Sequence, residues 1–148
     1  MNLFTEMLKA LAGAFFGTLG FAWLMRVPRR AWIPAGIIAS AVCLADWGLI
    51  RLGISEFSAV FCAVLLGSLA GHVCARKMQV INTLFLLCAI VPVVPGLELY
   101  RTMAALGSGQ NAQGVALGVY AMMIIAMTAL GLATGSFLDR LAHREKKQ

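Results

Sequence analysis

The sequence has 148 residues, of which 61% are hydrophobic and 12% are charged, and its formal net charge is +6. Globular domains average roughly 45–50% apolar and about 25% charged residues, so a water-soluble fold cannot bury this much apolar surface. The composition therefore excludes a soluble domain and predicts an all-α integral membrane protein.

Five stretches are nearly free of charge and reach the roughly 20 residues that a helix needs to cross a bilayer. They cover about residues 8–25, 33–52, 57–75, 80–106 and 112–138, which predicts one transmembrane domain over residues 1–148 with a basic tail at 139–148. The first stretch is too long for a removable signal peptide, and its positive flank is only Lys9, offset by Glu6. We expect it to remain as the first helix.

Basic residues gather on one side of this five-helix arrangement. Nine of the 12 fall there, and a re-entrant fourth segment would instead divide them six and six. By the positive-inside rule, this asymmetry favours five full crossings, with the N-terminus outside and the C-terminus in the cytoplasm. The charge thus points to lipid headgroups and not to nucleic acid. The nine are Arg26, Arg29, Arg30, Arg76, Lys77, Arg140, Arg144, Lys146 and Lys147.

Small residues recur at four-residue spacing in several of the stretches, a pattern that lets helices approach closely. It leaves open whether the packing lies within the chain, in a homo-oligomer or against a partner. The pairs are Gly13 with Gly17, Gly67 with Gly71 (flanked by Ala63 and Ala75), Gly114 with Gly118, and Gly131 with Gly135. The cysteines Cys43, Cys62, Cys74 and Cys88 show neither C-x-x-C spacing nor a histidine cluster. We therefore expect no disulfide, metal site or cofactor.

The fourth stretch contains IVPVVPGLELYR from Ile90 to Arg101, which is unlike a simple membrane anchor. Pro92 and Pro95 have no N–H, and Gly96 adds backbone freedom, so this P-x-x-P-G sequence predicts a broken helix. The break falls near the middle of residues 80–106, and hence near the bilayer midplane. Unpaired backbone at that depth is tolerated only inside protein or beside water, and broken helices of this kind form substrate sites in transporters.

Three ionisable residues lie within or near the membrane. Glu98 and Arg101, three residues apart on one helix face, could bind substrate, carry a coupling proton or neutralise each other. Alternatively, Arg101 extends with Tyr100 to the outer interface. Asp46 lies roughly 20 Å along the second helix and either pairs with Arg101 or a partner's cation, or extends toward Arg51.

Two stretches resemble the threonine/serine exporter family, specifically its small all-membrane subunit. FAWLMRVPRRA (21–31) matches a family junction at Val27, Pro28, Arg30 and Ala31, with Arg26 where Asn is usual. TLFLLCAIVPVVPGLELYRTM (83–103) matches or conservatively replaces the motif that breaks the fourth helix at Val91, Pro92, Pro95, Gly96, Tyr100 and Arg101. Many relatives have a Pro-Gly pair where this chain has Cys88 and Ala89, and a proline where it has Met78 or Gln79, so the break here is expected to be shorter.

The resemblance implies a multi-pass exporter of the bacterial cytoplasmic membrane, with a second, larger membrane subunit supplying the other half. Its substrates would be small carboxylates, as in a succinate exporter, or hydroxy amino acids. An alternative is a structural subunit that docks a larger transporting or catalytic partner without a site of its own. An intramembrane enzyme is not expected, since no serine, histidine and acid set converges and no H-E-x-x-H occurs.

Overall fold

The computed structural model describes residues 3–79, 86–87 and 90–144. Cys88, most of the beginning of the expected fourth helix and the last four residues of the basic tail therefore lie outside the described residues. Within the described ranges the chain is helical, with five α-helices and two one-turn 3-10 helices. The α-helices are α1 (Leu3–Leu24), α2 (Trp32–Arg51), α3 (Glu56–Met78), α5 (Gly96–Gly107) and α6 (Asn111–Arg144), and the 3-10 helices are η1 (Arg29–Ala31) and η2 (Val91–Val93).

Four helices in the described part are long and apolar enough to cross a membrane: Met7–Leu24, Arg29–Arg51, Glu56–Met78 and Asn111–Leu141. Two of them extend beyond their expected ends, because α3 continues to Met78 and α6 to Arg144. The residues expected to begin a basic tail at 139 are therefore still helical up to 144. The fourth segment differs most, since α5 has 12 residues, about 18 Å, and is too short to cross alone.

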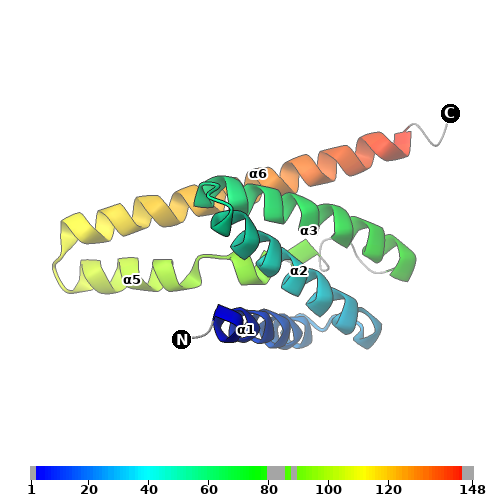
Figure 1. Ribbon diagram of the computed structural model, residues 1–148, viewed down its shortest axis with the longest axis horizontal. Helices are drawn as coiled ribbons and strands as arrows, with labels where there is room; N and C mark the ends of the chain where they lie inside the picture. The colour runs from blue at the N-terminus through cyan, green and yellow to red at the C-terminus, as the bar shows by residue number, and fades with distance from the viewer. Residues whose placement is uncertain (1–2, 80–85, 88–89, 145–148) are drawn as a thin grey trace.

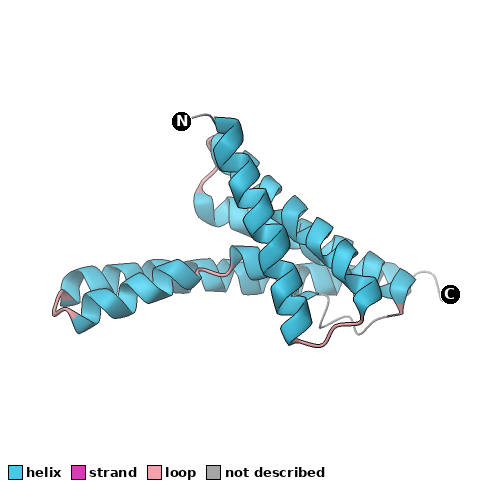
Figure 2. Ribbon diagram, turned by 90° about the horizontal axis from the view of Figure 1, so that it is seen from below, coloured by secondary structure: helices cyan, strands magenta, loops and turns pink. Residues whose placement is uncertain are grey.

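The molecule consists of a helical bundle with a protruding arm. The bundle is formed by α1, α2, α3 and the C-terminal part of α6. The arm is formed by α5 and the N-terminal part of α6, which lie side by side and project away from the bundle (Figure 1). Seen at right angles, the α5–α6 hairpin again projects from the other helices (Figure 2). α6 has 34 residues and is about 51 Å long, so it can belong to the arm at its N-terminal end and to the bundle at its C-terminal end.

α3 and α6 run parallel to each other. Tyr120 packs on Phe57 with ring centroids 5.8 Å apart, and further along both helices Gly135 faces Ser68. Near their C-terminal ends, Arg76 of α3 forms an ion pair with Asp139 of α6. The contacts thus advance in the same direction along both helices, so residues 79–110 carry the chain from the C-terminal end of α3 to the N-terminal end of α6.

Two clusters of buried apolar side chains form the core. The first joins α1, η1, α2 and α3 and includes Ala22, Ile38 and Val42; the second joins α3 and α6 through Val60, Val64 and Ile124. Val93 of η2 packs against both clusters. The short 3-10 helix therefore lies between the two parts of the core.

Most of the glycines that recur at four-residue spacing, here called the small-residue stripes, pack against other helices of the same chain. A Cβ at Gly67 would clash with Val42 of α2, and a Cβ at Gly114 would lie 2.7 Å from Leu106 of α5. A Cβ at Gly118 would lie 3.3 Å from Cγ2 of Thr102 in α5. Gly71 is buried. By contrast, a Cβ placed at Gly13 or Gly17 of α1 would meet no atom of the described residues within 4 Å. Among these stripes, the one on α1 is open to a partner.

Candidate functional site

The backbone between Ile90 and Gly96 departs from the α-helix. Val91–Val93 form one 3-10 turn, Val94 is extended (φ −64°, ψ 126°), and α5 begins at Gly96 after Pro95 (φ −77°, ψ 58°). A proline disfavours the helical conformation of the residue before it and donates no hydrogen bond, which explains the extended Val94. The segment therefore carries main-chain polar groups that are not part of an α-helical ladder.

This irregular segment lies inside the protein. η2 packs against α1 and α2, and its Val93 also reaches the cluster formed by α3 and α6. Helices of the same chain therefore surround it on more than one side. Such surroundings satisfy the condition under which irregular backbone is tolerated at membrane depth.

Glu98 and Arg101 form an ion pair at the start of α5, with 3.0 Å between Arg101 Nη1 and Glu98 Oε1. The Glu98 side chain is 23% exposed and that of Arg101 57%. Glu98 lies in the first turn of α5, where a carboxylate is favoured by the free N–H groups of the helix terminus. Tyr100, on the same helix, is 71% exposed and lies on the surface.

Asp46 is half-buried in α2, and its Oδ1 has no hydrogen-bond partner among the described residues. Neither of the two expected partners reaches it. Arg101 is paired with Glu98, and the guanidinium of Arg51 stacks over the ring of Trp47, 4.6 Å from its centroid. Within the described residues Asp46 thus pairs with neither Arg101 nor Arg51, and pairing with a cation of a partner stays a prediction.

The Asp46 side chain lies within electrostatic reach of Glu56 of α3 and Tyr120 of α6. The Tyr120 hydroxyl lies close to Glu56, and the carboxylates of Asp46 and Glu98 are near enough to act on it electrostatically. Asp46 and Glu56 interact with each other as well. α2, α3, α5 and α6 each contribute one residue, and we call Asp46, Glu56, Glu98 and Tyr120 the acidic cluster.

Sequence reasoning identified Asp46 and Glu98 but missed Glu56 and Tyr120. Glu56 begins α3, where an acid is ordinary at a helix N-terminus, and Tyr120 is a single aromatic residue in a long apolar helix. Neither carries a local signal of function. Within the described residues, no group of three or more His, Cys, Asp or Glu side chains is placed to hold a metal ion. The acidic cluster thus offers hydrogen bonding and negative charge, suited to an organic cation or a proton.

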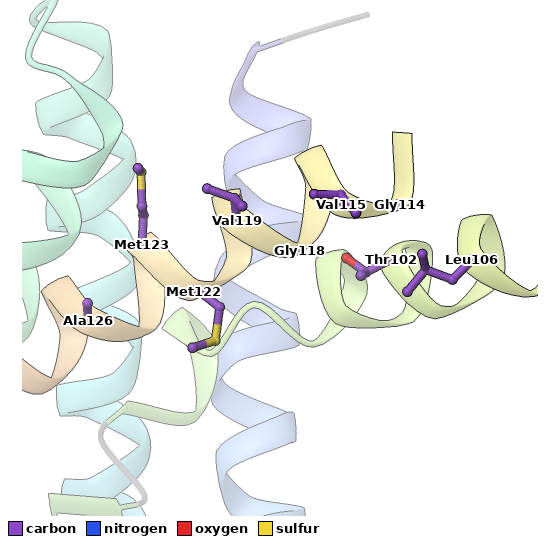
Figure 3. A pocket seen from close by; sticks show the side chains of 9 residues that line it. All are labelled: Thr102, Leu106, Gly114, Val115, Gly118, Val119, Met122, Met123 and Ala126. Atoms are coloured by element: carbon purple, nitrogen blue, oxygen red, sulfur yellow. The ribbon is translucent and has the colours of Figure 1, made fainter. Parts of the chain in front are cut away.

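A hollow lies on the arm, between α5 and α6, and has a volume of about 590 Å³ (Figure 3). Thr102 and Leu106 approach it from α5, while Gly114, Gly118 and neighbouring apolar side chains of α6 form the rest of its lining. The described residues that line it carry no charge, and several of its apolar side chains, including Met122, are exposed. Its chemistry suits lipid or an apolar helix better than a polar substrate.

The chain matches, over residues 10–138, the family described as Threonine/Serine exporter, ThrE. The matched range contains the irregular segment and all four residues of the acidic cluster. No curated protein and no solved structure matches the chain.

Proposed function

The chain belongs to the threonine/serine exporter family, and on that premise we propose that it is the membrane half of a two-component exporter. In this proposal, the substrate pathway passes the irregular backbone between Ile90 and Gly96, with Pro92 and Pro95 maintaining the break. Its family and its four candidate membrane spans make it a multi-pass membrane protein. As a transport component it acts without chemical conversion of its substrate.

The observation that carries the proposal is the position of η2, which packs against α1 and α2 and, through Val93, against the cluster of α3 and α6. A helix interrupted between other helices presents main-chain donors and acceptors to the protein interior. Transporters use this arrangement to bind a polar molecule near the bilayer midplane. The first turn of α5, with its free N–H groups, would face the substrate carboxylate.

The parallel packing of α3 and α6 supports a full crossing by the fourth segment. The α1–α2 loop and the C-terminal ends of α3 and α6 lie toward one side of the molecule, and the α5–α6 turn lies at the other (Figure 1). Arg29, Arg76 and Arg140 thus share one side, which the positive-inside rule assigns to the cytoplasm. The N-terminus would then be outside, as expected for an exporter in the bacterial cytoplasmic membrane.

The charge of the acidic cluster favours a hydroxy amino acid over succinate as the substrate. Asp46, Glu56 and Glu98 supply three carboxylates, and Arg101 supplies one guanidinium that Glu98 already binds. A dicarboxylate would add two negative charges to this surplus, whereas the ammonium group of an amino acid would balance part of it. The free N–H groups at the start of α5 would bind the single carboxylate, and Arg101 would contact it by exchanging Glu98 for the substrate.

The larger membrane subunit would cover the apolar faces that this chain leaves open. A Cβ placed at Gly13, Gly17 or Gly20 of α1 would meet no described residue within 4 Å, and the strongly exposed Phe16 and Trp23 lie on the same helix. Small residues bordered by large apolar ones suit the close approach of another helix. The alternative function, a docking subunit without a site of its own, would use the same surface.

Replacing Pro95 by Leu and Gly96 by Ala tests the proposed function. The double variant restores helix-forming residues, so we expect it to insert normally but to abolish efflux of threonine, serine and succinate from cells that also express the larger subunit. Pro34→Ala, in the first turn of α2, is the matched control and should leave efflux unchanged. Normal efflux by the Pro95 and Gly96 variant would remove this mechanism.

The docking alternative predicts a different pattern in the same assay. Efflux would survive Asp46→Asn, Glu98→Gln and Arg101→Gln but would fail with Gly13→Leu or Gly17→Leu, since only attachment of the partner would matter. A pathway through this chain predicts that the first three substitutions each reduce efflux.

A further inference from the structure

Two buried hydroxyl groups have no hydrogen-bond partner among the described residues: Thr18 Oγ1 in α1 and Ser68 Oγ in α3. Thr18 is 0% exposed and Ser68 2%. Other helical hydroxyls follow the usual pattern, and Thr128 Oγ1, also buried, donates to the Ile124 carbonyl at 2.8 Å. A buried polar group without a partner is costly and uncommon, so these two require a reason.

Both hydroxyls belong to helices that border the irregular fourth segment. Thr18 belongs to a buried strip of α1, with Ala14 and Ala22 one turn to either side, and α1 packs against α2 and η2. Ala22 belongs to the core cluster on which Val93 of η2 packs. Ser68 shares a narrow internal space with Ile90, the residue just before η2. Ser68 therefore lies near the break on α3, and Thr18 lies on the buried strip of α1, whose Ala22 belongs to the cluster that Val93 contacts.

The surroundings of Ser68 leave room for its hydroxyl. A Cβ at Gly135 of α6 would lie 2.5 Å from Ser68 Oγ, so only glycine permits this contact. The hydroxyl is thus directed at the backbone of a neighbouring helix and is not bonded to a carbonyl of its own. Thr18 likewise lacks the bond to the preceding turn that would satisfy it.

We propose that Thr18 and Ser68 are substrate-contacting residues that line the transport pathway on both sides of the break. This inference rests on the proposed function. An amino acid that crosses the bilayer loses water from its ammonium, carboxylate and hydroxyl groups, and buried hydroxyls replace those hydrogen bonds. The packed arrangement described here is the closed state, in which the two hydroxyls have no partner among the described residues until the helices separate enough to admit substrate.

Efflux of L-threonine by Thr18→Val and Ser68→Ala tests the inference in cells that also express the larger subunit. We expect each variant to lower the rate at limiting internal threonine by at least about tenfold, while Thr18→Ser retains most of it. Their unfolding temperatures should equal or exceed that of the wild type, because a costly buried group has been removed. Thr128→Val, whose hydroxyl is already bonded within its own helix, is the matched control and should export normally.

Wild-type efflux by both Thr18→Val and Ser68→Ala would overturn the inference and leave the proposed function standing. Absence of efflux from the wild type would instead contradict the proposed function for threonine. Labelling of Thr18→Cys with a small cationic methanethiosulfonate then decides whether a pathway reaches this position. We expect labelling above that of the wild type and of Thr128→Cys; a Thr18→Cys variant that stays unlabelled would also overturn the inference.

Discussion

Arg76 near the end of α3 forms an ion pair with Asp139 near the end of α6, and this contact joins the C-terminal ends of two parallel helices. Two parallel helices connected by residues 79–110 require the connecting chain to return to the opposite end of the bundle. The irregular segment around Pro92 and Pro95 lies on that return path. The ion pair thus reflects the parallel packing of α3 and α6, which requires the chain between them to pass back along the molecule.

The two ends of the connecting segment should lie on opposite sides of the membrane. We expect topology reporters inserted at Gln79 and Gly109 to report cytoplasmic and external positions, respectively. Reporters at Arg51 and Arg144 provide the external and cytoplasmic references. The same side for Gln79 and Gly109 would mean that the fourth segment is re-entrant.

The ion pair itself should contribute modestly to stability. Asp139→Arg and Arg76→Asp place like charges together and should each destabilise the protein, and the double exchange should recover part of the loss. Because Arg76 is 38% exposed, we expect a coupling free energy of about 0.2–1 kcal/mol. A double-mutant cycle of unfolding in detergent measures it, and additive effects of the two substitutions would show that the contact is not energetically coupled.

Substitution by Leu should lower the stability of the chain at Gly114 but hardly change it at Gly13. Leu at position 114 meets Leu106 of α5, so we expect a loss of about 1–3 kcal/mol in the free energy of unfolding. Leu at position 13 meets none of the described residues close to its Cβ and should change the stability of the isolated chain by about 0.5 kcal/mol or less. Denaturant titration in mixed micelles compares the two, and equal losses would contradict the packing of α5 on α6.

Gly13→Leu should have its effect on assembly. If the larger subunit packs on the open face of α1, the substitution blocks close approach and should reduce recovery of the tagged complex from detergent at least several-fold. Met122→Ala, which alters the hollow of the arm, should leave recovery nearly unchanged. The reverse result would place the partner on the arm instead.

Arg101 should be required for transport and Arg51 should not. Arg101 is paired with Glu98 at the start of α5, whereas Arg51 stacks on Trp47 at the end of α2. We expect Arg101→Gln to reduce threonine efflux by about tenfold or more, because the substrate carboxylate loses a cationic partner. Arg51→Gln should export within about twofold of the wild type. Equal efflux from both variants would show that Arg101 only neutralises Glu98.

The sequence by itself determined those features that depend on local chemistry. Long apolar stretches predicted the helices because each must cover about 30 Å of hydrocarbon, and the resemblance to the exporter family is confirmed by the match over residues 10–138. Pro92, Pro95 and Gly96 predicted irregular backbone because a missing N–H acts on its own helix. The sequence predicts earlier ends for α3 and α6 because charged residues interrupt their apolar pattern, whereas in the structure Arg76 and Asp139 pair across these ends.

Only the tertiary structure decided which distant residues meet. In the structure Gly67 and Gly114 pack against neighbours within the chain, whereas Gly13 is exposed. Glu56 and Tyr120 lie within electrostatic reach of Asp46, and Glu98 also acts on Tyr120. Thr18 looks ordinary in a linear sequence, and its unpaired hydroxyl is evident only after α1 has packed. The physical reason is that side-chain contacts between helices depend on their relative rotation and direction, which the hydrophobic pattern of each helix does not specify.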